Sequence, residues 1–225
     1  MKVLLRVDCS ITENDSVSRR LTEHFVTHWR RKHPDTTVEV LDLVTRALPH
    51  FGCDNLRGLA APPDSQTAAM RAANALSEQL IAQVERADLV VIGCPMYNFT
   101  IPTQLKTWLD YITRVGRTFR YSGPNRAEGL LGGKKVLVLE ARGGDYSASP
   151  ANTWDFQEPL LRHWFRFLGI EDVHFVRAEG LKIDPQWVPA ILKTAEDRLV
   201  QWLEEERAEE RVELDSREPA ARLID

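Results

Sequence analysis

Short apolar segments alternate with longer amphipathic segments along the 225 residues, and this alternation restricts the possible folds more than any other feature. The strand-like segments begin near residues 3, 38, 88, 135 and 172. Strands that alternate with helices form βαβ units with right-handed crossovers, which build a parallel sheet covered by helices on both faces. The sequence therefore predicts a three-layer α/β domain.

The segments between these strands carry apolar residues at helical spacing. Val17, Leu21, Phe25 and Trp29 form one stripe, and Ser16 is available as an N-cap before it. Later helices are expected within residues 64–86, 105–112, 160–168 and 185–206. The stretches 44–66 and 117–133 show no sustained period and are expected to be irregular excursions. We expect one domain over residues 1–206 and a charged tail over 207–225, either a fraying helix or a solvated segment.

Composition and charge exclude several classes of protein and site. The formal net charge of −4 provides no attraction to nucleic acid or to an anionic membrane, and no apolar run approaches the roughly 18–20 residues of a membrane span. Cys9, Cys53 and Cys94 are odd in number and lack CxxC spacing, so neither a disulfide framework nor a zinc site is expected. Free cysteines are compatible with the reducing cytoplasm, which we expect as the location. The histidine pair His24 and His28 lacks a nearby third ligand, so we expect no metal site.

Ligands of open parallel sheets bind beyond the carboxyl ends of the strands, and the first loop at this edge is rich in hydroxyls. It contains Ser10, Ser16, Val17 and Ser18, just before the first helix. A phosphate there would meet free N–H groups, the positive end of the helix dipole and hydroxyl donors. The loop has neither a GxGxxG nor a P-loop pattern, so it suits a monophosphate. The alternative is that Ser16 only caps the helix.

Two further loops at this edge have the composition of a cofactor pocket. The loop after the strand at 88–93 consists of Pro95, Met96, Tyr97, Asn98 and Phe99. The loop after the strand at 135–140 consists of Ala141, Arg142, Gly143 and Gly144. Aromatic walls with one amide would suit a flat ligand, and glycines would let the backbone approach it. Ordinary core aromatics and a plain turn are the alternatives.

The second loop and its surroundings resemble a known family. The first matching run is Pro95-Met96-Tyr97-Asn98-Phe99-x-Ile101-Pro102-x-Gln104-Leu105-Lys106. Further matches are Arg114-x-Gly116-x-Thr118-Phe119-Arg120-Tyr121, Glu128-Gly129-Leu130, Arg142-Gly143-Gly144, Phe167-Leu168-Gly169-Ile170 and Ala178-Glu179-Gly180. These motifs occur in matching order over residues 1 to about 203 and resemble the FMN-dependent NADH-azoreductase family.

This resemblance implies a flavodoxin-like fold with sheet order 2-1-3-4-5 and a homodimer that binds FMN non-covalently. By position, Ser10 and residues 16–18 match the family's FMN-phosphate loop, residues 96–99 match the stretch against the flavin ring, and residues 141–144 match the loop at its pyrimidine edge. The chain departs from the family at Ala141, where Ser or Thr is frequent, so a hydroxyl contact is missing there. The tail also exceeds the usual family length.

The resemblance further implies an NAD(P)H:quinone oxidoreductase that reduces azo compounds by ping-pong hydride transfer through FMN, with NADH or NADPH as donor. The flavin would carry the chemistry, so no catalytic acid–base residues are expected. Phe119 and Tyr121 are candidates for the substrate side, from the same or the partner subunit, or for core packing. Asp8 is expected to face away from the phosphate, and Cys94 to be a buried structural thiol. The alternatives are a flavodoxin-like electron carrier and a regulatory α/β protein without cofactor.

Overall fold

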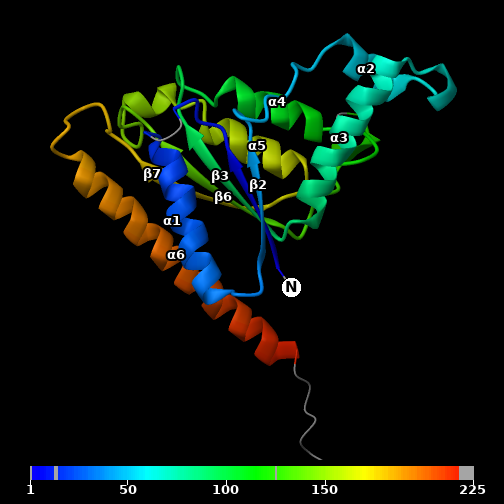
Figure 1. Cartoon of the computed structure of the whole chain (residues 1–225). Coiled ribbons are helices and arrows are strands. Elements are labelled where there is room, and N and C mark those ends of the chain that lie inside the picture. Colours follow the sequence, from blue (N-terminus) through cyan, green and yellow to red (C-terminus); the bar gives the residue numbers. More distant parts are fainter. Residues whose placement is uncertain (1, 13–14, 125, 218–225) are drawn as a thin grey trace, which may run out of the picture.

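A five-stranded parallel sheet forms the centre of the protein (Figure 1). The structure is a computed structural model that describes residues 2–12, 15–124 and 126–217. The strand order across the sheet is β2-β1-β3-β6-β7, with every neighbouring pair parallel. The strands are β1 (Val3–Asp8), β2 (Thr37–Asp42), β3 (Leu89–Pro95), β6 (Lys135–Ala141) and β7 (Asp172–Ala178). The predicted three-layer α/β class is confirmed.

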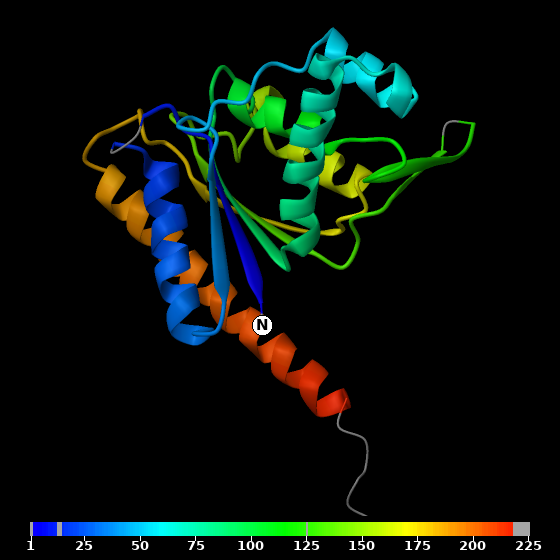
Figure 2. The same ribbon diagram turned by 45° about the vertical axis from the view of Figure 1, so that its right-hand side comes forward.

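Helices cover both faces of the sheet, as Figures 1 and 2 show. One face carries α1 (Val17–Lys32) and α6 (Val188–Arg217), which pack against each other and against the sheet. The other face carries α3 (Ala68–Arg86), α4 (Thr103–Ile112) and α5 (Glu158–Phe167). A separate hydrophobic core fills each interface, because every residue of the central strand β3 is buried and its side chains alternate between the two faces.

The first helix forms as the sequence indicates. The Ser16 hydroxyl accepts a hydrogen bond from the Arg19 N–H at 3.2 Å and so caps the helix. Leu21, Phe25 and Trp29 form the buried stripe against the sheet and α6. These contacts fix the N-terminus of α1 at the carboxyl end of β1.

The predicted sheet order 2-1-3-4-5 needs one correction. Residues 117–133 are not an irregular excursion but contain a two-stranded antiparallel hairpin, β4 (Phe119–Gly123) and β5 (Arg126–Gly129), so the last two strands of the main sheet are β6 and β7. Figure 2 shows the hairpin projecting from the body. Its strands are short and mostly exposed, so they lack the apolar alternation that marks a strand in sequence.

Two other boundaries differ from the prediction. The stretch 44–66 contains α2 (Cys53–Ala60) and a short 3-10 turn at Pro63–Ser65. The last helix, expected over 185–206, runs from Val188 to Arg217, because its end is rich in the strong helix formers Glu, Arg and Ala. Most of the predicted tail is therefore helical, and residues 218–225 lie outside the described residues. Within the described ranges, no helix has both the length and the hydropathy to span a membrane.

Candidate functional site

The loops at the carboxyl ends of β1, β3, β6 and β7 enclose a cavity of about 390 Å³. This volume falls within the range of about 300–1,000 Å³ that is usual for small-molecule sites. The cavity is lined by Ser10, Thr12, Asp15, Ser16, Val17, Ser18, Pro95, Met96, Tyr97, Ala141, Arg142, Gly143, Leu181 and Lys182. The structure thus brings together the three loops selected from the sequence. Three of the residues selected in these loops, Asn98, Phe99 and Gly144, are not among those that line it.

The β1–α1 loop supplies hydroxyls and helical N–H groups to the cavity. The hydroxyls of Ser16 and Ser18 lie 3.2 Å apart. The N–H groups of Val17 and Ser18 belong to the first turn of α1 and have no acceptor among the described residues. Unpaired N–H groups at a helix N-terminus attract anions. Ser16 therefore both caps α1 and lines the cavity, so the two alternatives for this residue are compatible.

Arg19 fixes the position of this loop. Its guanidinium donates to the Ser10 carbonyl at 2.9 Å and to the Asp42 carboxylate at 2.5 Å. The Arg19 hydrogen bond holds the pKa of Asp42 at about 2. This pair ties the β1–α1 loop to the end of β2, so the loop is braced before any ligand binds.

Asp8 lies beneath the same loop and does not line the cavity. Its buried carboxylate accepts hydrogen bonds from Arg6 at 2.7 Å and from Thr22 at 2.8 Å. Burial raises the pKa of Asp8, and the nearby Arg6 charge partly opposes this effect. The carboxylate is thus engaged with the interior rather than with the hydroxyl-rich side of the loop, in line with the orientation expected from the sequence.

The β3–α4 loop folds as a tight two-residue turn. Tyr97 and Thr100 exchange backbone hydrogen bonds of 3.0 and 3.2 Å, and the central residues Asn98 and Phe99 have φ angles of 48° and 71°. A left-handed conformation is common for Asn but costs roughly 1–2 kcal/mol for a residue such as Phe. Strain of this kind clusters at functional sites. The turn also places the Tyr97 hydroxyl 3.2 Å from the Ile11 N–H, which links the first two loops.

Phe99 lies outside the lining of the cavity, in a partly exposed group of aromatic side chains. Its side chain is 48% exposed, and its ring makes edge-on contacts with Tyr146 and Trp154. The Phe99 carbonyl accepts a hydrogen bond from the Phe156 N–H. Tyr146 also packs against Gly144, whose added Cβ would lie 3.2 Å from the ring. The alternative that Phe99 is an ordinary core aromatic is wrong, because nearly half of it is exposed.

The β6–α5 loop is paired with the segment after β7. The Arg142 N–H donates to the Ala178 carbonyl, the Leu181 N–H to the Arg142 carbonyl and the Lys182 N–H to the Gly143 carbonyl, at 2.9–3.1 Å. A Cβ at Gly143 would lie 2.9 Å from Lys182 Cγ, so a glycine is required for this close approach. The N–H of Gly143 has no acceptor among the described residues.

Leu181 and Lys182 also line the cavity, although they were not predicted from the sequence. They follow the matched Ala178-Glu179-Gly180 motif, at the carboxyl end of the fifth strand of the sheet. The rule that ligands bind at the carboxyl ends of parallel strands, applied to this fourth loop, would have found them. Lys182 forms no ion pair among the described residues, and it lines the cavity together with the carboxylate-bearing residue Asp15.

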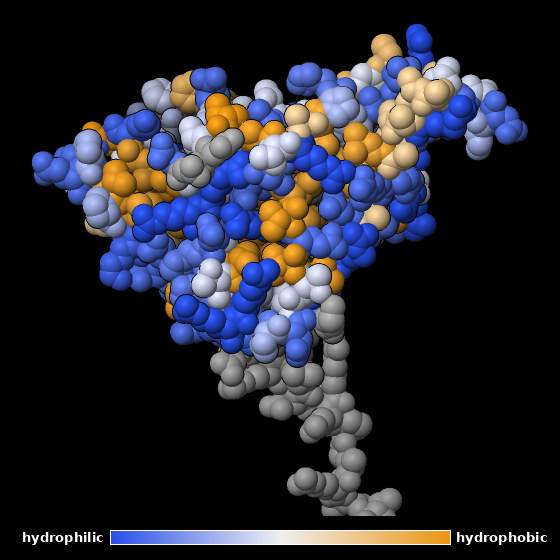
Figure 3. Space-filling view, viewed as in Figure 1, coloured by the Kyte–Doolittle hydropathy of each residue, from blue (hydrophilic) through white to orange (hydrophobic). Residues whose placement is uncertain are grey.

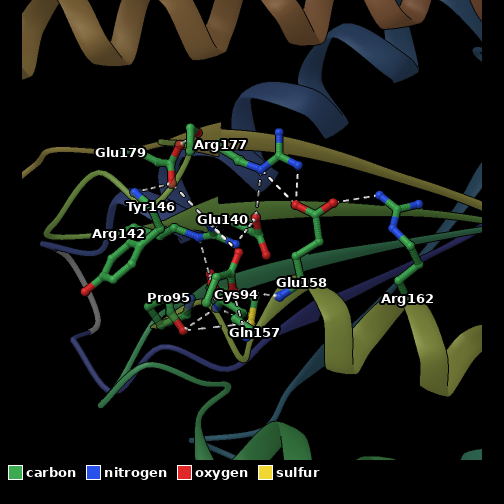
Figure 4. A network of polar contacts seen from close by, with 12 residues as sticks. Cys94, Pro95, Glu140, Arg142, Tyr146, Gln157, Glu158, Arg162, Arg177 and Glu179 are labelled. Carbon is green, nitrogen blue, oxygen red and sulfur yellow. Dashed lines mark hydrogen bonds and ion pairs between the residues drawn. The ribbon is translucent and has the colours of Figure 1, made fainter. Parts of the chain in front are cut away.

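An ionic cluster with a buried centre supports the β6–α5 loop from the side of α5 (Figure 4). Arg142 is 1% exposed and contacts three carboxyl groups, Glu140 at 2.7 Å and Asp155 and Glu179 at 3.0 Å. Arg177 lies between Glu140 and Glu158, and Arg162 pairs with Glu158. We call these charged residues the Arg142 cluster; its members are Glu140, Arg142, Asp155, Glu158, Arg162, Arg177 and Glu179.

Gln157 connects this cluster to the end of β3. Its side-chain oxygen accepts from Arg142 Nε at 3.0 Å, and its amide nitrogen donates to the Pro95 carbonyl at 3.0 Å and contacts Cys94 Sγ at 3.1 Å. The Cys94 thiol is fully buried and so plays the structural role expected of it. Two cavity loops are therefore held by one set of buried polar contacts.

The hairpin residues Phe119 and Tyr121 do not lie with the other predicted site residues. Phe119 is buried against Phe167 of α5, which matches the core-packing alternative. Tyr121 is 70% exposed on the projecting hairpin, and neither residue lines the cavity. The hairpin packs on the α5 side and projects away from the four loops (Figure 2), so the substrate-side role of both residues stays a prediction that the cavity of the same subunit does not support.

Comparison with known proteins places this fold and site in a family. Residues 1–203 match the family described as having a flavodoxin-like fold. The FMN-dependent NADH:quinone oxidoreductase of Azotobacter vinelandii is 42% identical over 201 residues, which cover 89% of this chain and 99% of that protein. The protein of the same name from Albidiferax ferrireducens is 49% identical, over 85% of this chain and 95% of the relative.

Solved structures give the same result. An azoreductase from Bacillus anthracis aligns with a TM-score of 0.83 and 32% identity, over 89% of this chain and 98% of that chain. An FMN-dependent NADH-azoreductase from Bacillus anthracis, in complex with FMN, aligns with a TM-score of 0.80 and 26% identity, over 90% of this chain and 99% of that chain. The chain belongs to the flavodoxin-like family that includes the FMN-dependent NADH:quinone oxidoreductases.

Proposed function

We propose that this protein is an FMN-dependent NADH:quinone oxidoreductase whose cavity at the carboxyl edge of the sheet binds FMN. The observation that carries the proposal is the cavity itself, where unpaired N–H groups of α1 and two hydroxyls lie opposite the glycine-containing β6–α5 loop. One end of the cavity suits a phosphate and the other suits a flat ring. The names of relatives up to 49% identical support the same cofactor and reaction.

Each loop has a distinct part in holding the cofactor. The N–H groups of Val17 and Ser18, with the hydroxyls of Ser10, Ser16 and Ser18, would bind the phosphate, where the α1 dipole adds to the attraction. Residues 95–97 would form one wall for the ring. The third loop, residues 141–144, would offer the Gly143 N–H to a ring carbonyl. Asn98 is proposed as a contact at the rim, since it does not line the cavity.

Bound FMN supplies two-electron hydride exchange between a nicotinamide donor and a quinone or azo acceptor. The protein residues bind, orient and shield it. The Lys182 side chain and the unpaired Gly143 N–H would offer positive charge and a hydrogen-bond donor to the negative charge of the bound cofactor. Phe99 follows the lining residue Tyr97 in the same turn, and the aromatic group that it forms with Tyr146 and Trp154 would shield the edge of the cofactor from water. NADH is the proposed donor, and the acceptor uses the same opening after the donor leaves, which gives ping-pong kinetics.

Azo reduction and dimerisation complete the proposal. The azoreductase names of two structural relatives support azo compounds as acceptors. Figure 3 shows several separate apolar patches on one face. Among the described residues, Phe99, Trp154 and Phe156 are 48–61% exposed and Phe99 contacts the other two, and an exposed aromatic group of this kind favours a homodimer. In such a dimer the projecting hairpin could bring Tyr121 to the partner's site. The free thiols support the cytoplasm as the location.

Cofactor binding and reduction test this proposal together. Purified protein is saturated with FMN, desalted and mixed with NADH or NADPH without oxygen, while the visible flavin absorption is followed. We expect retained FMN, bleaching within seconds by NADH, and turnover when a quinone or an azo dye is added. Riboflavin is the matched control ligand, because it lacks the phosphate, and we expect it to bind at least about tenfold more weakly.

Three results would contradict the proposal. If FMN stays bound but neither nucleotide bleaches it, the protein is an electron carrier that depends on another reductase. If FMN and riboflavin bind equally, the N-terminus of α1 is not a phosphate site. Failure to retain any flavin would favour a regulatory protein without cofactor.

A further inference from the structure

Glu140 is a fully buried carboxyl group next to the cofactor loop, yet it does not line the cavity. It is 0% exposed at the end of β6, two residues before Arg142. One oxygen, Oε2, accepts from Arg142 Nη2 at 2.7 Å and lies 3.6 Å from Arg177 Nε. The other oxygen, Oε1, is buried and has no hydrogen-bond partner among the described residues. A carboxylate with an unsatisfied buried oxygen is unfavourable in its charged form.

The charges around Glu140 do not compensate for its burial. Arg142 is shared with Asp155 and Glu179, and Arg177 is shared with Glu158. Burial therefore outweighs the attraction of Arg142 and raises the pKa of Glu140 to about 8. With Glu140 neutral, the three arginines and three remaining carboxylates of the Arg142 cluster balance; with Glu140 ionised, the cluster carries one negative charge.

The Arg142 cluster is directly connected to the loop that lines the cavity. Arg142 contributes both the guanidinium at the centre of the cluster and backbone groups that pair with the segment after β7. Glu179 accepts from the Tyr146 N–H at 3.1 Å and from the Ser147 hydroxyl, so the cluster also holds the chain that leaves this loop. Figure 4 shows Glu140, Arg142 and Glu179 side by side. A change in charge at Glu140 therefore acts on both ends of residues 141–144.

We propose that Glu140 is a positioning residue that acts through Arg142: the 141–144 loop binds the flavin most tightly while Glu140 is neutral, and ionisation of Glu140 weakens flavin binding. The inference rests on the proposed binding of FMN. An extra negative charge below the loop opposes an anionic cofactor, and it opposes the reduced, more negative form even more. The negative charge of ionised Glu140 also attracts the Arg142 guanidinium away from Asp155 and Glu179.

The charged and titratable neighbours of Glu140 come from β3, β7, α5 and the adjoining loops. Arg177 is the register partner of Glu140 on β7, and Cys94 is its partner on β3. Glu158 faces it from α5, and Asp155 and Glu179 face it through Arg142. Burial also raises the pKa of Glu140 more strongly than the neighbouring Glu158 does. Among the described residues of this group, Glu140 alone combines full burial with a carboxylate oxygen that has no hydrogen-bond partner, so its charged form is the one that the site stabilises least.

The test compares the pH dependence of FMN affinity in three full-length proteins. These are the wild type, Glu140→Gln, which is neutral at every pH, and Glu171→Gln, in which a 74% exposed carboxylate is removed as a control. The dissociation constant of FMN is measured by quenching of flavin fluorescence at pH 6.5 and 9.5. Titration of FMN itself affects all three proteins equally, so the comparison isolates Glu140.

We expect similar affinities at pH 6.5, where residue 140 is neutral in all three proteins. At pH 9.5 the dissociation constant of FMN should be at least about fivefold higher for the wild type and Glu171→Gln than for Glu140→Gln. A fivefold change is typical of the coupling between two linked sites. The reduction potential of bound FMN should fall more steeply with pH in the wild type than in Glu140→Gln. If Glu140→Gln is unfolded by circular dichroism, Glu140→Met is the second neutral variant.

Three results would overturn the inference. Parallel pH dependence in the wild type and Glu140→Gln would mean that Glu140 does not titrate or does not act on the flavin, while FMN binding and the proposed function would stand. A large loss of affinity in Glu140→Gln at pH 6.5 would mean that an ionised Glu140 is needed. If no protein binds FMN, the proposed function fails and this inference fails with it.

Discussion

The substitution Glu140→Gln should stabilise the fold at neutral and alkaline pH. Burial raises the pKa of Glu140 from the ordinary 4.5 to about 8, so the folded protein binds this proton more tightly than the unfolded chain. The stability from the bound proton is fully present below pH 4.5 and is lost as the pH rises to about 8. At 1.36 kcal/mol per pH unit, the loss is about 3 kcal/mol at pH 7 and at most about 5 kcal/mol above pH 8.

Urea unfolding without added FMN measures this effect separately from cofactor binding. The free energy of unfolding is determined for the wild type and Glu140→Gln at pH 5 and at pH 8.5. The advantage of the variant should grow by up to about 4 kcal/mol between these values, because only the wild type loses the stability of the bound proton. Other titrating groups contribute to both proteins and cancel in the difference. If the variant is less stable by a constant amount at both pH values, Glu140 is ionised throughout as the partner of Arg142, and the reasoning is refuted.

The remaining predictions concern residues at the cavity and its rim. Ser16→Ala should lower the free energy of unfolding by about 1 kcal/mol, because the α1 cap is lost, and should also weaken FMN binding. The control Thr67→Ala removes the equivalent cap of α3, so it should lower the stability in urea unfolding by a similar amount and leave FMN affinity unchanged. Gly143→Ala should reduce FMN affinity in a fluorescence titration, because the added Cβ meets Lys182. The control Gly132→Ala, whose added Cβ has its nearest contact at 3.5 Å, should leave the affinity unchanged. If both variants bind FMN as tightly as the wild type, the assigned role of the 141–144 loop is contradicted. Phe99→Asn should relieve up to about 1 kcal/mol of backbone strain in urea unfolding and lower quinone turnover, so unchanged turnover would contradict a role of Phe99 at the cofactor.

The sequence predicts the central architecture because its signals are local. The strand β3 is a continuous apolar run buried on both faces, and α1 has both a cap and an apolar stripe, so each can be identified without knowledge of its neighbours. The hairpin β4–β5 could not be found in this way. Its Gly129 packs against the backbone of Gly169, and this contact between distant residues stabilises strands that are otherwise polar and exposed.

The candidate site was predicted in outline for a similar reason. Carboxyl ends of parallel strands must meet at one edge, so Ser16, Met96 and Gly143 can be grouped from topology alone. The Arg142 cluster cannot be grouped in this way, because its members come from three separate segments, residues 140–142, 155–162 and 177–179, and only folding brings them together. The orientation of the hairpin was equally hidden, so Phe119 and Tyr121 were selected although they lie away from the cavity.

A crystal structure of the protein with bound FMN tests the central claim most directly. The account predicts the phosphate against the N–H groups of Val17 and Ser18, the ring beside Met96 and Tyr97, and the pyrimidine edge at Gly143. A flavin bound elsewhere, or bound in this cavity with its phosphate away from the N-terminus of α1, would contradict it.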